Sequence, residues 1–212
     1  MSGDRLSVEA RLGPGAELVL TSAAAEKVYR STGSETRVET RFTIGAGARL
    51  EWLPQETILF DRCRFRRTIE VELHLDGAAL ILEATVFGRQ ASGETLRHGS
   101  VADRWRVRRG GRLIYADALR FEGHVAAILD RPAVAAGRPA LATMLYVAPD
   151  APARLDAARE NLAACASECG ASAWNGLLLV RWLAPDVATL RRDLARFMTA
   201  FRGRPLPRVW QT

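Results

Sequence analysis

Gly47-Ala48-Arg49-Leu50 is one of four Gly-x-x-Leu segments in the chain, and the others are Gly15-Ala16-Glu17-Leu18, Gly77-Ala78-Ala79-Leu80 and Gly110-Gly111-Arg112-Leu113. They follow one another at intervals of 32, 30 and 33 residues. A glycine turn that leads into an apolar strand and recurs about every 30 residues is typical of stacked units, which bury their apolar faces only against their neighbours. A plain antiparallel meander, which also places glycine turns between strands, is the alternative.

Apolar and polar residues alternate in the segments that flank these turns. The clearest cases are residues 37–44 (RVETRFTI), 68–75 (TIEVELHL) and 104–108 (RWRVR). Alternation of this kind is the pattern of a strand with one buried face. Together with the recurrence, it predicts a mainly β protein in which residues 1–148 form a β-helix-like or coiled scaffold of repeating strand units.

The pattern changes after Pro139. Residues 141–147 fit one more strand, and the segment from Pro149 to Pro152 then opens an alanine-rich helix, because proline is tolerated in the first helical turn. Apolar residues recur at helical spacing as far as Gly170, and they are Leu155, Ala158, Leu162, Cys165 and Cys169. One face of this helix is therefore expected to be buried.

A strand and a second helix follow. Residues 174–183 (WNGLLLVRWL) fit one buried strand, and Asp186 stands where a helix N-cap is expected. The second apolar stripe consists of Val187, Leu190, Leu194, Phe197 and Phe201. We expect residues 149–212 to form a helix-strand-helix cap with an extended tail, packed over the open end or flank of the β scaffold and covering its edges, within a single domain of residues 1–212.

Composition narrows the classes of partner and compartment. Lys27 is the only lysine among 30 cationic residues, and the net charge is +6. Because arginine favours protein interfaces and no nucleic-acid motif is present, protein partners are favoured over nucleic acid. No apolar run long enough to cross a membrane and no secretion signal occur, so a cytoplasmic location is predicted. Three cysteines do not make a disulfide framework.

Side chains with metal-binding or catalytic chemistry are scattered. His74, His98 and His124 lie 24 and 26 residues apart with no partner at ligand spacing. Cys165 and Cys169 could clamp a soft metal, but their place on the apolar stripe favours two small buried hydrophobes. The phosphate-loop, nucleophile-elbow and zinc-protease motifs are absent from the sequence. We therefore predict neither an enzyme nor a high-affinity metal site.

Residues 51–60 (EWLPQETILF) resemble the signature of the UreD family, also called UreH, of urease accessory proteins. Four further segments resemble family motifs in the family's order, namely GDRL at 3–6, TSAAAEKVYR at 21–30, FGRQASGE at 87–94 and PLPRVW at 205–210. Family members usually carry a further stretch before the first of these motifs, so the chain is expected to lack that N-terminal part.

The resemblance implies a non-catalytic metallochaperone scaffold, β-helix-like with C-terminal helices, that acts in urease maturation. Its implied partners are UreF, UreG and apo-urease, in a homodimer of heterocomplexes, with nickel in transit and no resident cofactor. The motif residues are candidates for partner contact, structure or the nickel path: Asp4, Lys27, Tyr29, Arg30, Leu53, Pro54, Gln55, Glu56, Gly88, Arg89 and Glu94. Among them, Asp4, Glu56 and Glu94 are the first carboxylates to consider for the path.

Two points stay open at the level of sequence. Gln55 and Glu56 either satisfy buried backbone groups, which we favour, or line a passage. The alternative functions are a β-solenoid carbohydrate-active hydrolase or lyase, which needs two or more of Glu56, Glu83 and Glu94 to converge in a surface groove, and an arginine-rich nucleic-acid-binding protein.

Overall fold

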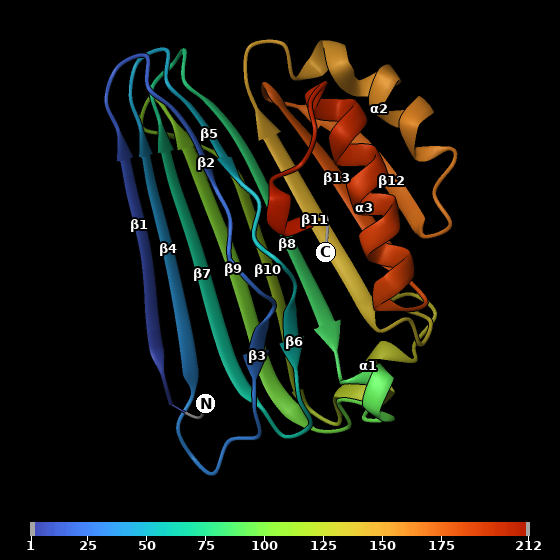
Figure 1. Cartoon of the computed structure of the whole chain (residues 1–212). Helices are drawn as coiled ribbons and strands as arrows, with labels where there is room; N and C mark the ends of the chain where they lie inside the picture. Colours follow the sequence, from blue (N-terminus) through green and yellow to red (C-terminus); the bar gives the residue numbers. More distant parts are fainter. Residues whose placement is uncertain (1–2, 211–212) are drawn as a thin grey trace.

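The computed structural model describes residues 3–210, which form two facing β-sheets with helices on the outer face of the second (Figure 1). The first sheet contains, in spatial order, β1 (Arg5–Leu12), β4 (Thr36–Ile44), β7 (Arg64–Leu73), β9 (Gly99–Arg109) and β10 (Arg112–Gly123). The second contains β12 (Glu168–Trp174), β13 (Leu177–Ala184), β11 (Ala140–Val147), β8 (Ala78–Phe87), β5 (Arg49–Trp52) and β2 (Glu17–Leu20). Two short strands, β3 (Glu26–Val28) and β6 (Thr57–Leu59), continue this sheet beside the second half of β8.

The chain winds through both sheets as a coil, so the stacked interpretation is confirmed. Strands β1, β4, β7 and β9 pair in parallel in the first sheet, and β2, β5 and β8 do so in the second. The glycine turns set the register of the second sheet, because Leu18 lies beside Leu50. Leu50 in turn lies beside Ala79, so the third segment is offset by one residue from the predicted repeat.

The fourth glycine segment does not begin another coil. Gly110 and Gly111 form the turn of an antiparallel hairpin between β9 and β10, with Arg112 paired to Arg109. Of the four Gly-x-x-Leu segments, this one therefore follows the antiparallel alternative. Two consecutive glycines with positive φ suit a tight hairpin, whereas in the coil turns Gly15 and Gly47 each have a positive φ and Gly77 does not.

The C-terminal third contributes two strands where one is expected. Residues 174–183 are not one strand, because Asn175 and Gly176, at φ 51° and 74°, form a two-residue turn between β12 and β13. Asn-Gly is a strong hairpin signal that outweighs the apolar run after it. Strand β13 pairs with β11, so this segment extends the second sheet.

The helices are η1 (Gln90–Ser92), α1 (Val125–Leu129), η2 (Pro152–Arg154), α2 (Leu155–Leu162), α3 (Val187–Arg202) and η3 (Arg208–Trp210). Helices α2 and α3, with η3, cover the outer face of the second sheet (Figure 1), whereas α1 packs with Phe87 and Phe121 in a separate cluster. Helix α2 ends at Leu162, short of the predicted Gly170, and the tail turns through η3; residues 211–212 lie outside the described range. The Asp186 N-cap is confirmed, since its side chain accepts from the Thr189 amide at 2.7 Å.

Apolar side chains fill two layers. Between the sheets, Phe42, Ile69 and Ile81 belong to one buried cluster. On the other side of the second sheet, Trp182 packs edge-on against Phe197 of α3 at 5.1 Å. Nine of the ten residues of β8 are buried, because this strand is covered on both faces. Among the described residues, no helix is long and apolar enough to cross a membrane.

Candidate functional site

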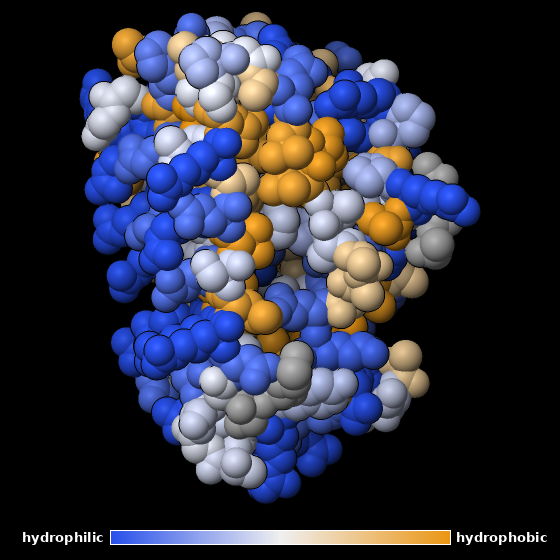
Figure 2. Space-filling view, turned by 60° about the vertical axis from the view of Figure 1, so that its left-hand side comes forward, coloured by the Kyte–Doolittle hydropathy of each residue, from blue (hydrophilic) through white to orange (hydrophobic). Residues whose placement is uncertain are grey.

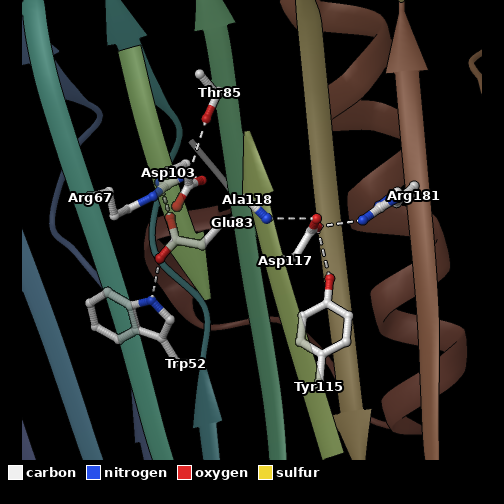
Figure 3. A network of polar contacts seen from close by, with 9 residues as sticks. All are labelled: Trp52, Arg67, Glu83, Thr85, Asp103, Tyr115, Asp117, Ala118 and Arg181. Atoms are coloured by element: carbon white, nitrogen blue, oxygen red, sulfur yellow. Dashed lines mark hydrogen bonds and ion pairs between the residues drawn. The ribbon is translucent and has the colours of Figure 1, made fainter. Parts of the chain in front are cut away.

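A cluster of charged side chains lies buried between the two sheets (Figure 3). The Arg67 guanidinium, on β7, pairs with the carboxylates of Glu83 on β8 and Asp103 on β9. The Trp52 indole donates to the second Glu83 oxygen at 2.7 Å, and Arg67 also donates to the Thr85 hydroxyl at 3.3 Å. The cluster therefore connects the two sheets through the ion pair between Arg67 on β7 and Glu83 on β8.

The cluster contains more carboxylates than guanidinium groups. Glu26 lies close enough to interact with Arg67, so three carboxylates face one guanidinium. Burial raises the pKa of Glu83 and of Glu26, and the attraction of Arg67 opposes that rise in both. A buried carboxylate with too little positive charge nearby tends to take up a proton or to bind another cation.

A second polar group lies between β10 and β13 and is partly exposed, since the side chains of Asp117 and Arg181 are 34% and 50% exposed. The Asp117 carboxylate pairs with Arg181 across the sheets and accepts from the Tyr115 hydroxyl at 3.0 Å (Figure 3). It also accepts from the Ala118 amide at 2.9 Å. Burial and the Asp117 charge together raise the pKa of the Tyr115 hydroxyl, so Tyr115 stays neutral and donates its hydrogen bond.

Two cavities flank the buried cluster. One, of about 310 Å³, is lined by Glu26, Arg67 and Glu83 and reaches Leu6 of β1. The other, of about 330 Å³, is lined by Asp103, Asp117 and Arg181 among apolar residues. Figure 2, turned toward the side of β1, shows apolar side chains between hydrophilic flanks. The Oδ1 atom of Asp103 and the Nε atom of Arg67 have no hydrogen-bond partner in the described part of the chain. Asp103 can therefore accept, and Arg67 donate, one more hydrogen bond beside the cavities.

The LPQE segment, residues 53–56, is a buried bulge between β5 and β6. Both strands pair with β8, but four residues here face only three on β8, because Trp52 lies beside Ile81 and Thr57 beside Thr85. Pro54 thus occupies a break in the ladder, where its missing amide hydrogen costs nothing.

The bulge anchors the C-terminal tail, and so two of the family-like motifs meet. The carbonyl oxygen of Leu53 accepts from the Trp210 indole at 3.0 Å, and the Gln55 amide donates to the Val209 oxygen at 3.2 Å. Arg191 of α3 donates to Gln55 and to Glu56, at 2.7 Å each. These contacts favour the structural interpretation, although Gln55 also lines the cavity beside Glu83.

Other motif residues gather on one groove. Lys27, Tyr29, Glu56, Gly88 and Arg89 line a hollow of about 340 Å³. An adjoining hollow of about 550 Å³ is lined in part by Tyr29, Arg30, Arg89 and Glu94. Segments that lie some 60 residues apart in the sequence thus form a single surface.

Aromatic and ionic contacts hold this groove in place. The Tyr29 ring packs edge-on against Phe60 at 4.6 Å, and the Arg89 guanidinium lies 4.5 Å from the same Phe60 ring. Arg89 also pairs with Glu94. Gly88, at φ 98°, admits no side chain because a Cβ would collide with the backbone oxygen of Glu94.

Asp4 lies apart from both cavities and from the motif groove. It immediately precedes β1, and its backbone oxygen accepts from the Arg37 amide at 2.8 Å. Glu56, Glu83 and Glu94 do not share a site either, since they pair with Arg191, Arg67 and Arg89 respectively. The arrangement that the hydrolase or lyase alternative needs is therefore not formed.

The cysteines occupy different places from those predicted. Cys165 follows α2 and Cys169 lies in β12, so they do not share a helical face. Both are half-buried, and burial, followed by the nearby Cys165, raises the pKa of the Cys169 thiol to about 11. No group of three or more His, Cys, Asp or Glu side chains able to hold a metal occurs among residues 3–210.

Most of the buried cluster is missing from the residues that the sequence motifs indicate. Glu26, Arg67, Asp103 and Asp117 are absent from the candidate residues, and only Glu83 was considered, in a catalytic role. One signal was present, because Arg67 falls in phase with the buried Phe65 and Ile69 along β7. A charge at an inward position of an alternating strand points to a buried partner.

Comparison with known proteins places the chain in a family. The model of the UreD urease accessory protein family matches residues 1–211. A urease accessory protein UreD from Xanthobacter autotrophicus is 58% identical over 210 residues, which cover 99% of this chain and 73% of the relative. A UreD from Azorhizobium caulinodans is 55% identical, over 98% of this chain and 77% of the relative. Because the model and the relatives match almost the whole chain, it belongs to the UreD family of urease accessory proteins.

Proposed function

We propose that the chain is a non-catalytic cytoplasmic scaffold for urease maturation, which acts with UreF and UreG to load nickel into apo-urease. Family membership supports the maturation role. The observation that supports a role in nickel transfer is the acidic cluster between the sheets, with a cavity on each side of it.

This interior has the chemistry of a weakly binding cation path. Its carboxylates outnumber its guanidinium groups, with Glu26, Glu83, Asp103 and Asp117 against Arg67 and Arg181. Transit requires binding that attracts the ion yet releases it, and carboxylates held by arginine provide attraction without a closed ligand set. The proposed path thus runs through these residues in place of Asp4, Glu56 and Glu94.

Co-expression with urease and the other accessory proteins tests the path. Glu83→Gln keeps the shape of the side chain and removes its charge, so urease should contain less nickel by elemental analysis and show lower activity. Glu70→Gln, on the outer face of the same sheet, is the matched control, because its side chain is 45% exposed. Unchanged nickel content in both Glu83→Gln and Asp103→Asn would refute the path. Loss of UreF co-purification would instead assign these residues to folding or assembly.

We further propose that the groove at Tyr29 and Arg89 contacts a protein partner. Tyr29 is 44% exposed although it is a large aromatic residue, and aromatic and arginine side chains dominate binding energy at interfaces. Tyr29→Ala should reduce co-purification of UreF or urease although the variant remains folded, as a cooperative thermal unfolding transition would show. Leu75→Ala, which changes an apolar residue that is 67% exposed elsewhere, is the control. Equal co-purification by both variants would place the partner surface elsewhere.

A further inference from the structure

Two histidines that appear unrelated in the sequence lie in contact. The ring centroids of His98 and His124 are 4.3 Å apart, with an angle of 60° between the rings. His98 directly precedes Gly99 and His124 directly follows Gly123, and these two glycines are the last pair of the β9–β10 ladder. The sequence places no partner at ligand spacing from either histidine, and the two meet because the antiparallel register brings residues 26 apart to the same edge.

The backbone on both sides of this pair is held in place. The His98 amide donates to the Asp61 carboxylate at 2.9 Å, and its carbonyl oxygen accepts from the Arg62 amide at 2.8 Å. The carbonyl oxygen of His124 accepts from the Ile128 amide at 3.3 Å at the start of α1. Both side chains are exposed, so solvent and ions can reach the two rings while the backbone hydrogen bonds hold the main chain in place.

We propose that His98 and His124 together form a surface site for a divalent first-row transition-metal ion. Imidazole nitrogen is a preferred ligand for nickel, copper and zinc, and two imidazoles held in contact can bind one ion at a lower entropic cost than two independent side chains. The Asp61 carboxylate, whose Oδ1 accepts from the His98 amide, adds negative charge near the site. Water completes the coordination, since no third protein ligand joins the pair within the described chain.

His74 shows what a lone histidine looks like in the same molecule. It is exposed, as the other two are, but its Nδ1 atom bonds to Asp76, with no second imidazole beside it in the described residues. His74 thus offers one imidazole where the pair offers two. This difference makes His74→Gln the matched control for His98→Gln and His124→Gln.

Titration of the purified full chain with nickel chloride tests the site directly and does not depend on the maturation role. Removing a residue that only hydrogen-bonds to a metal ligand typically lowers metal affinity about 10–100-fold. Removing one of the two ligands themselves should therefore weaken Ni²⁺ binding about tenfold or more. His98→Gln and His124→Gln should each show this loss in calorimetry, and His74→Gln should bind as the unaltered chain does. Equal affinity in all four proteins would overturn the proposal.

Two further measurements guard against a folding artefact. Ni²⁺ should raise the thermal midpoint of the unaltered chain and of His74→Gln, but not that of the other two variants, because only a folded site stabilises by binding. With Cu²⁺ as the probe, electron paramagnetic resonance should detect two coupled nitrogens in the unaltered chain and one in either paired variant. The same nitrogen count in all four proteins would contradict a site formed by this pair.

Discussion

Arg66 and Arg67 are neighbours on β7 but face opposite sides of the first sheet. The Arg66 side chain is 51% exposed on the outer face, where it bonds to Glu35 at 2.9 Å. The Arg67 side chain is 5% exposed and pairs with Glu83 and Asp103 between the sheets. The same residue type therefore serves two purposes, because strand alternation sends one guanidinium to water and the other into the interior.

The outer face shows what arginine does when water surrounds it. Glu35 accepts from both Arg37 and Arg66 at 2.9 Å. Arg41 pairs with Glu39 on its own strand and with Glu70 on the parallel neighbour β7. Such ladders neutralise much of the positive charge on this face, which argues against a nucleic-acid surface here. They contribute little to stability because solvent screens them. The inner cluster is screened far less, so disturbing it has larger consequences.

The largest expected effect is that of Arg67→Ala. Removal of one partner leaves buried carboxylates uncompensated, which costs about 3–5 kcal/mol of unfolding free energy. Urea denaturation should show this loss. Replacing Glu26, Arg67, Glu83 and Asp103 together by uncharged residues of similar volume should restore much of it, because no charge of the cluster is then left unpaired. A loss below about 0.5 kcal/mol in Arg67→Ala, the size usual at a surface, would contradict the buried ion cluster.

A buried apolar residue provides the next comparison. Leu194 on α3 is 1% exposed and belongs to the cluster outside the second sheet. Leu194→Ala should cost about 2–5 kcal/mol, which is the range for a packed leucine. Equilibrium unfolding measures it. A negligible change would mean that α3 does not pack on the sheet as described, and it would point to a partner-binding helix instead.

A smaller effect, with a distinctive pH dependence, is expected for Glu26→Gln. Burial raises the pKa of Glu26 above 4.5, so the folded state holds this proton more tightly than the unfolded state. The resulting contribution to stability is complete below the unfolded pKa and is lost as the pH rises through the folded one. At pH 7 the Gln variant should therefore be more stable than the unaltered chain, and its advantage should shrink as the pH falls toward 4.5. Thermal unfolding at several pH values tests this, and an advantage that grows on acidification would contradict the raised pKa.

The smallest effect should be that of Arg66→Ala, the outward counterpart of Arg67→Ala. Its ion pair with Glu35 is exposed on the arginine side, and such pairs are worth about 0–1 kcal/mol. The variant should unfold within about 0.5 kcal/mol of the unaltered chain. Both arginine variants can be compared in one denaturation series. If their losses were similar, the difference in burial between the two faces of β7 would not govern the energetics.

Local signals in the sequence determined the coil and the start and buried face of one helix. A glycine turn followed by an apolar strand repeats, because each coil must turn at the same place to stack on the last. Asp186 at the start of α3 and the apolar stripe that includes Leu190 and Leu194 were likewise readable, since capping and helical spacing involve only nearby residues. The motif set identified the family. By contrast, the Asn175-Gly176 turn was readable but overlooked.

Tertiary structure alone decided which polar side chains meet. Arg67 pairs with partners 16 and 36 residues away, and His98 contacts a residue 26 away. Whether such residues touch depends on the register between strands, and a slip of one residue would turn every side chain to the opposite face. The glycine repeat indicates part of the register in the second sheet, but nothing in the spacing of Arg67 or His98 identifies the residues that they contact. The sequence therefore determined the architecture and the family, whereas the buried ion cluster and the histidine pair follow from how the coils and the hairpin pair.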